Sequence, residues 1–301
     1  MTTALLALVM VACFGTWIPL SQSVRGPSQQ TRIVYVALGN MVVASIALGV
    51  GGAHLAFGWR ALWLPVAGGV AWTAGVYAAF RATELTGLAR AAGTWTPLNI
   101  VTAFVLGITL FDELAHSSAA RLGVLAAALV LVLVGVLVIV GSQGAAGNAA
   151  RTPGEKRAGL AWAIAAGVLW GGYFVPSQWA KVTAQAGNFP LAIGILLAAV
   201  VMAAGTRSPI AVGNARRWAA RAGVLVASGA IFGVGDVVLL VLVGRLGTGV
   251  GFTVAQLSLL VNAAIGIWVL KAPPPGSRAA RIALYGIAIA GSGGLMIGGL
   301  R

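Results

Sequence analysis

Apolar stretches of roughly 18 to 25 residues, separated by short turns that hold most of the charged side chains, make up almost the whole sequence. A helix rises 1.5 Å per residue, so a stretch of this length crosses a hydrocarbon core about 30 Å thick. The alternating pattern of a membrane β-barrel is absent. Of the 301 residues, 59% are hydrophobic and 8% are charged, which leaves too few polar side chains to cover a water-soluble domain. The sequence therefore predicts an all-α integral membrane protein.

Ten transmembrane helices are expected, with approximate boundaries. They cover residues 4–24, 33–52, 61–83, 89–110, 120–141, 158–180, 189–205, 222–244, 248–270 and 282–300. A polar stretch that contains glycine and proline separates the first five spans from the last five. We predict a first five-helix repeat at 1–141, a central cytoplasmic linker at 142–157 and a second five-helix repeat at 158–301.

The two halves share short motifs at corresponding spans. Gly15-Thr-Trp-Ile-Pro19 in the first span matches Gly172-Tyr-Phe-Val-Pro176 in the sixth. Gly69-Val-Ala-Trp72-Thr-Ala-Gly75 in the third span matches Gly229-Ala-Ile-Phe232-Gly-Val-Gly235 in the eighth. Because each repeat has an odd number of spans, the second must enter the membrane from the opposite side. This predicts two inverted repeats, an architecture typical of transporters.

The matching prolines, Pro19 and Pro176, are predicted helix breaks. Proline lacks an amide hydrogen, and such breaks are tolerated in membranes where they line a cavity or pack against neighbouring helices. A simple packing kink is the alternative.

The basic residues indicate orientation rather than nucleic-acid binding. The formal charge is +14, but Lys and Arg occur singly or in small groups between spans, and no basic helix is available for a groove. Most of them follow the odd-numbered spans. The positive-inside rule therefore places these turns in the cytoplasm and predicts a multi-pass protein of the cell membrane with both termini facing outward.

Catalytic and cofactor chemistry find no support in the sequence. The single cysteine, Cys13, allows neither an intrachain disulfide nor a cysteine metal site. No nucleotide-binding P-loop is present, and no nucleophile and base accompany each other inside the spans. We therefore predict neither an enzyme nor a bound cofactor or metal.

Span ten carries small residues every four positions, at Gly286, Ala290, Gly294 and Gly298. This spacing lets helices approach closely. We favour packing within the monomer, and a homodimer contact is the alternative.

Asp236 lies well inside the eighth span, where an ionisable group is costly and marks a candidate functional site. Desolvation favours its neutral form, so its protonation can be linked to solute occupancy. Asp236 is therefore a proton-coupling candidate. Direct hydrogen bonding to the solute and a purely structural role are the alternatives.

Several motifs resemble the drug/metabolite transporter superfamily. Gly69-Val-Ala-Trp-Thr-Ala-Gly75, Pro97-Leu-Asn99 and Leu110-Phe-Asp-Glu113 resemble its third-to-fourth-helix block. Gly235-Asp236 and Phe252-Thr-Val-Ala-Gln256-Leu-Ser258 resemble more specifically its glucose/ribose porter branch. The resemblance implies a secondary transporter that moves a small polar solute, a sugar, by alternating access. An exporter of amino acids or drug-like metabolites is the alternative.

A sugar presents hydroxyl groups at its rim and apolar C–H faces, so its site needs aromatic surfaces beside amides or carboxylates. The spans expected to face the centre supply both kinds of side chain. For any one aromatic, lipid contact or packing is the alternative. The candidate substrate-binding residues are Trp17, Trp72, Trp95, Asn99, Tyr173, Phe232, Asp236, Gln256 and Ser258.

The predicted topology is tested with cysteine labels placed before Thr2, after Arg301 and within 142–157. Labels at the two termini should react with an impermeant reagent in intact cells, because both termini are expected outside. The label in the linker should react only after the cells are opened. The reverse pattern would overturn the orientation.

Overall fold

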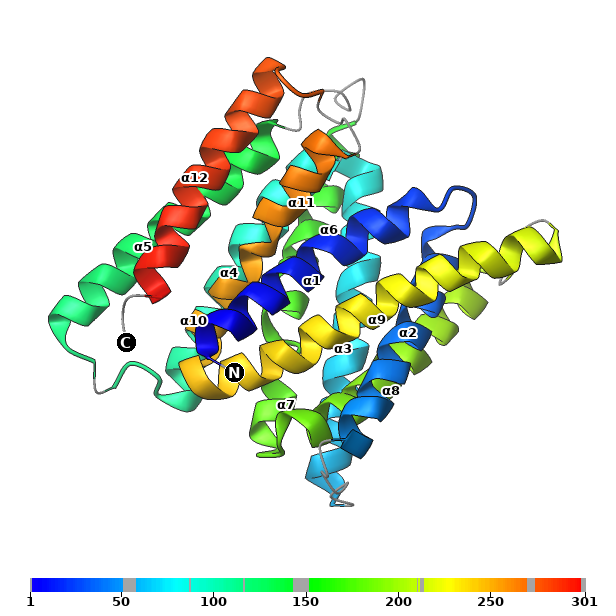
Figure 1. Ribbon diagram of the computed structural model, residues 1–301, viewed down its shortest axis with the longest axis horizontal. Helices are drawn as coiled ribbons and strands as arrows, with labels where there is room; N and C mark the ends of the chain where they lie inside the picture. The colour runs from blue at the N-terminus through cyan, green and yellow to red at the C-terminus, as the bar shows by residue number, and fades with distance from the viewer. Residues whose placement is uncertain are drawn as a thin grey trace. The chain divides into compact units, whose positions relative to one another are not determined.

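The computed structural model describes residues 2–50, 58–86, 88–115, 117–142, 152–209, 211, 214–269 and 274–298, and within these ranges every regular element is a helix (Figure 1). Ten spans among them are long and apolar enough to cross a membrane, which confirms the predicted fold class. The helices are α1 (Thr3–Ser23), α2 (Gln29–Val50), α3 (Trp59–Thr86), α4 (Leu88–Phe111), α5 (Ala119–Ser142), α6 (Pro153–Gly172), α7 (Val175–Trp179), α8 (Ala184–Gly205), α9 (Ala215–Leu246), α10 (Thr248–Gln256), α11 (Ser258–Trp268) and α12 (Arg278–Gly298).

Several helices begin before the predicted apolar spans, because polar residues continue them beyond the hydrocarbon core. α6 begins at Pro153, although its span was predicted from residue 158. The Thr152 hydroxyl accepts a hydrogen bond from the Glu155 amide, and the Glu155 carboxylate accepts one from the Thr152 amide. This is a capping box, which a search for apolar runs does not register. The linker residues between α5 and this cap, 143–151, lie outside the described part of the chain.

α9 is the longest helix, with 32 residues, and at 1.5 Å per residue it extends about 48 Å. That length exceeds a hydrocarbon core of about 30 Å, so one or both of its ends must reach the headgroup region. Its first turns carry Arg216, Arg217 and Arg221, which are all exposed. The predicted span at 222–244 therefore covers only the apolar part of a longer helix.

The helices form two compact units. Unit 1 contains Met1–Ala74 and Tyr173–Gly244, and unit 2 contains Gly75–Gly172 and Arg245–Arg301. Each unit therefore combines segments from both predicted five-helix repeats. The division of the chain into repeats stays a prediction.

In unit 1, α2 and α9 cross where Gly39 meets Gly229. A Cβ atom on Gly39 would overlap the carbonyl oxygen of Val226, three residues before Gly229. A Cβ atom on Gly229 would overlap the carbonyl oxygen of Val36, three residues before Gly39. The two backbones therefore touch directly, and only glycine fits at either position.

The crossing of α3 with α8 repeats this geometry. A Cβ atom on Gly69 would overlap the carbonyl oxygen of Leu191, three residues before Gly194. A Cβ atom on Gly194 would overlap the carbonyl oxygen of Val66, three residues before Gly69. The second and third spans thus cross the eighth and seventh spans through the same reciprocal contact.

The turn between α1 and α2 is held by Arg32, which is buried despite its charge. Its guanidinium donates hydrogen bonds to the carbonyl oxygens of Ser21 and Val24 at the end of α1. The end of a helix leaves carbonyl groups without helical partners, and Arg32 satisfies two carbonyl groups of this turn. This basic residue therefore also has a structural role.

In unit 2, α5 and α12 lie side by side along much of their length (Figure 1). A Cβ atom on Gly286 would lie 2.7 Å from the carbonyl oxygen of Gly135, and one on Gly293 would lie 2.6 Å from that of Ala128. Ala290 in turn packs over Gly135. The small residues of span ten are thus used for packing within the monomer.

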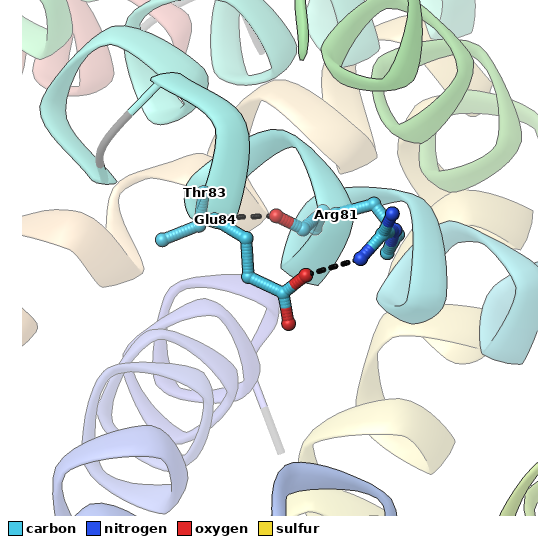
Figure 2. A network of polar contacts seen from close by, with 4 residues as sticks. Arg81, Thr83 and Glu84 are labelled. Carbon is cyan, nitrogen blue, oxygen red and sulfur yellow. Dashed lines mark hydrogen bonds and ion pairs between the residues drawn. The ribbon is translucent and has the colours of Figure 1, made fainter. Parts of the chain in front are cut away.

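At the end of α3, also in unit 2, Arg81 donates to Glu84 at 2.6 Å, and both side chains are exposed (Figure 2). The Thr83 hydroxyl bonds the carbonyl oxygen of Ala79 in the preceding turn. An exposed ion pair of this kind contributes little to stability. Glu84 is therefore a suitable control position for substitutions of other carboxylates.

The glycine crossing of unit 1 is tested by Gly39→Ala. The added methyl group cannot be accommodated without separating α2 from α9, so the variant should lose about 1–3 kcal/mol of stability. The matched control is Gly49→Ala in the same helix, where an added Cβ meets nothing within 4 Å. Thermal unfolding in detergent should show a lower midpoint for Gly39→Ala and an unchanged or slightly raised midpoint for Gly49→Ala. Equal midpoints would contradict the close crossing.

Candidate functional site

Unit 1 contains a cluster of four aromatic rings, in which Phe232 of α9 contacts the other three. The ring centroid of Phe232 lies 4.8 Å from that of Trp72 on α3, 5.2 Å from that of Trp17 and 5.7 Å from that of Phe14 on α1. Trp17 and Trp72 also contact each other at 6.2 Å. Phe14 and Trp17 are three residues apart and therefore share one helix face. The sequence predicted three members of this cluster and missed Phe14.

The aromatic cluster is placed by the glycine crossings and by one hydrogen bond. Phe232 follows Gly229 by three residues, and Trp72 follows Gly69 by three residues. The Ser228 hydroxyl donates to the carbonyl oxygen of Trp17 at 2.7 Å, which ties α1 to α9. α1 stays helical through the buried Pro19 and ends at Ser23. The three helices therefore hold their rings in fixed positions.

Asp236 lies one helical turn after Phe232 and is completely buried. The hydroxyl group of the buried Tyr173 donates a hydrogen bond to Oδ1 of Asp236 at 2.8 Å. The other carboxyl oxygen, Oδ2, is buried and has no hydrogen-bond partner among the described residues. Buried polar atoms in native proteins normally have a partner, which can be a water molecule or a ligand. Oδ2 of Asp236 is therefore a buried acceptor for which the described residues supply no donor.

Tyr173 stands where the sixth span is interrupted. The backbone forms a turn at Tyr173 and Phe174, and helix resumes as α7, whose second residue is Pro176. Because proline has no amide hydrogen, it is tolerated in the first turn of a helix. A Cβ atom on Gly68 of α3 would overlap the Tyr173 carbonyl oxygen, so α3 packs closely on this turn. The predicted break near Pro176 thus positions the tyrosine that binds Asp236.

Asn40 of α2 is a further polar residue in this region, and it was not among the residues predicted from the sequence. It is completely buried, and neither atom of its amide has a hydrogen-bond partner within the described residues. A Cβ atom on Gly233, three residues before Asp236, would lie 2.8 Å from Oδ1 of Asn40. The glycine therefore makes room for the amide. The sequence feature that could have identified Asn40 is its polar amide inside the second apolar span.

In unit 2, α4 carries two of the predicted residues. Trp95 contacts Trp170 of α6 edge to face at 5.7 Å. Asn99 is buried, and its Oδ1 has no partner in the described part of the chain. A Cβ atom on Gly171 would lie 2.6 Å from the carbonyl oxygen of Asn99, so α6 and α4 touch at this point. Asn99 is thus a second buried amide with unused hydrogen-bonding capacity.

The remaining two candidates flank an interruption in the ninth span. The sequence predicted the ninth span at 248–270, and within it the structure ends α10 at Gln256 and begins α11 at Ser258. Leu257 lies between them, and a Cβ atom on Gly294 of α12 would lie 2.5 Å from its side chain. Gln256 and Ser258 are both half-buried. Leu257 has φ −62° and ψ −13°, which stay in the right-handed helical region, so α10 and α11 together form the predicted ninth membrane span.

The predicted site residues thus form two sets, each described within its own unit. Unit 1 brings together five of them, with the additions Phe14 and Asn40. Unit 2 holds the other four. The members of the first set are Trp17, Trp72, Tyr173, Phe232 and Asp236, and those of the second are Trp95, Asn99, Gln256 and Ser258.

Three known proteins resemble this chain in sequence over 69% to 98% of its length, and one solved structure resembles its fold. A protein of Listeria innocua named "Putative sugar uptake protein" is 24% identical over 98% of this chain and 97% of its own length. Proteins of the same name from Lactiplantibacillus plantarum and Listeria monocytogenes are 21% and 22% identical over 69% and 76% of this chain and 70% and 76% of their own lengths. A solved crystal structure superposes with a TM-score of 0.65 at 21% identity, over 98% of this chain and 95% of that chain, and this likeness concerns the fold alone.

The family model described as "Sugar transport protein" matches residues 5–298. This range includes nine of the ten membrane spans completely, all but the first two residues of the first span, and every candidate residue of both sets. The chain therefore belongs to the sugar transport protein family.

Proposed function

We propose that this protein is a secondary transporter that moves a sugar across the cell membrane by alternating access. The observation that carries the proposal is the buried pair of Asp236 and Tyr173 beside the aromatic cluster around Phe232. The names of the relatives, which refer to sugar uptake, support a sugar as the solute. Apolar spans alone would need neither the carboxylate nor the unpaired amides.

The chemistry of the first set suits a sugar. The rings of Trp17, Trp72 and Phe232, which pack against one another in this structure, would supply flat apolar surfaces for the C–H faces of a sugar. Oδ2 of Asp236 and the amide of Asn40 can each bind a hydroxyl group, since a hydroxyl both donates and accepts. A polar solute would satisfy atoms that are otherwise buried without partners.

The helix crossings support the inverted repeats that alternating access requires. The Gly69 motif was matched to the Gly229 motif from sequence, and each glycine makes the same reciprocal backbone contact with its partner, Gly194 or Gly39. The turn at Tyr173, which separates α6 from α7 within the sixth span, also supports a transporter, because discontinuous helices commonly form solute sites near the bilayer midplane. The two repeats would then exchange conformations, so that the solute site opens to each side of the membrane in turn.

Asp236 is the proposed site of proton coupling. A carboxyl group that can use one oxygen for Tyr173 and one for the solute links its protonation to solute occupancy. Hydrogen bonding to the solute without coupling is the competing role. The two roles differ in whether a pH gradient can drive accumulation.

Asp236→Asn separates these roles in proteoliposomes with and without an imposed pH gradient. If Asp236 couples protons, the wild-type protein accumulates sugar under the gradient, whereas the variant exchanges sugar without concentrating it. The control is Asp112→Asn, because Asp112 is exposed in a turn and asparagine tolerates its positive φ of 52°. A wild-type protein indifferent to the gradient would rule out coupling.

Gln256→Ala tests the second set. We expect weaker solute binding, by about 0.5–1.5 kcal/mol for one lost hydrogen bond, with little change in stability, because Gln256 stands at a helix interruption and is half-buried. Binding is measured by the thermal shift of purified protein with a panel of sugars, amino acids and cationic drugs. Gln22→Ala, an exposed amide, is the control.

Unchanged affinity in a well-folded Gln256→Ala variant would remove this residue from the site. A thermal shift by amino acids or cationic drugs, with none by sugars, would favour the exporter alternative instead.

A further inference from the structure

Glu113 lies just after α4, in a turn whose preceding residue, Asp112, has a positive φ of 52°. Its carboxylate accepts hydrogen bonds from two consecutive backbone amides at the start of α10. Oε1 accepts from the Thr248 amide, and Oε2 accepts from the Gly249 amide at 3.1 Å. A residue from the first half of the sequence therefore caps a helix of the second half.

The surroundings of this carboxylate are shaped to receive it. A Cβ atom on Gly107 of α4 would lie 2.5 Å from Oε2 of Glu113. Gly247, with a positive φ of 89°, precedes α10, and a Cβ atom there would lie 2.9 Å from the same group. Glycine at both positions leaves the space that the carboxylate occupies, and any other residue at Gly247 would also be strained.

α10 depends on this contact for its N-terminal cap. The first amides of a helix have no helical partner, and the residue before α10 is Gly247, which has no side chain to supply one. The N-terminus of a helix also carries partial positive charge, which favours a carboxylate. Next to it, the Phe104 ring packs where a Cβ atom on Gly249 would lie 2.7 Å from the ring. Glu113 and Phe104 together dock the first turn of α10 on α4.

The position of this first turn determines where Gln256 lies. α10 has nine residues, so it is a short rigid rod of about 13 Å with Thr248 at one end and Gln256 at the other. At the far end, Leu257 packs against Gly294 of α12. The helix is thus held at both ends, and the interruption that carries Gln256 and Ser258 lies at the second.

We propose that Glu113 is a positioning residue: by binding the N-terminus of α10, it sets the place of Gln256 and Ser258 at the helix interruption. The contact of Gln256 and Ser258 with the solute rests on the proposed function. The control of their position by Glu113 is independent of the proposed function.

The first test uses hydrogen exchange and requires no solute. In Glu113→Ala, the amides of Thr248 and Gly249 lose their acceptors and should exchange about tenfold faster or more, which corresponds to about 1.4 kcal/mol. Positioning further predicts faster exchange along α10 as far as Gln256. The control is Glu84→Ala, which removes a carboxylate from the exposed pair with Arg81 (Figure 2) and should leave α10 unchanged.

Faster exchange confined to Thr248 and Gly249, with Gln256 unaffected, would show a local cap and overturn the proposal. Glu113→Gln guards against a general loss of folding, because its amide oxygen can still accept one of the two hydrogen bonds. Its exchange rates should fall between those of wild type and Glu113→Ala. Exchange rates of Thr248, Gly249 and Gln256 in Glu113→Ala that equal those of wild type would also overturn the proposal.

The second test measures binding with the same panel of sugars, amino acids and cationic drugs. Glu113→Ala should bind the sugar recognised by wild type about tenfold more weakly, although Glu113 binds the opposite end of α10 from Gln256. Unchanged affinity together with faster exchange at Gln256 would overturn the link to the solute. If wild type binds no sugar while exchange still spreads to Gln256, the positioning role stands and the proposed function fails.

Discussion

Direct contact between helix backbones is the interaction on which the rest of this structure depends. In a bilayer, lipid tails are as apolar as leucine, so burying apolar side chains between helices yields little, and association relies on close packing and hydrogen bonds. Gly39 and Gly229 show how this is achieved, since each lacks the atom that would strike the carbonyl oxygen opposite. Gly69 and Gly194 do the same between α3 and α8. Helices in such contact have little freedom to slide or rotate.

These crossings determine the geometry of the candidate site. Phe232 and Trp72 each follow a crossing glycine by three residues, and Asp236 follows Phe232 by one more turn. The rings and the carboxylate are thus positioned by rigid helices rather than by loops, and a site built this way is more precise. The space left by Gly233 allows Asn40 to approach the same stretch of α9.

The breaks between consecutive helices differ in how well the sequence predicts them. The turn at Tyr173 lies close to Pro176, where the sequence predicted a break, whereas α1 stays helical through Pro19. The break at Leu257 has no such signal, because its residues are ordinary helix formers and the interruption accompanies packing against Gly294. The tie from Glu113 to α10 joins positions far apart in the chain, and no local pattern predicts it.

Hydropathy and spacing alone determined the all-helical membrane fold and its ten spans, because the bilayer imposes a length and composition that each span must meet separately. They also made Asp236 a candidate site residue, since an isolated carboxylate in an apolar run is conspicuous whatever surrounds it. Only the tertiary structure decided that Tyr173 is its hydrogen-bond partner, that Phe14 and Asn40 join its surroundings, and that Glu113 binds α10. These contacts arise where helices distant in sequence meet, and the fit of side chains across such contacts is a property of both surfaces together.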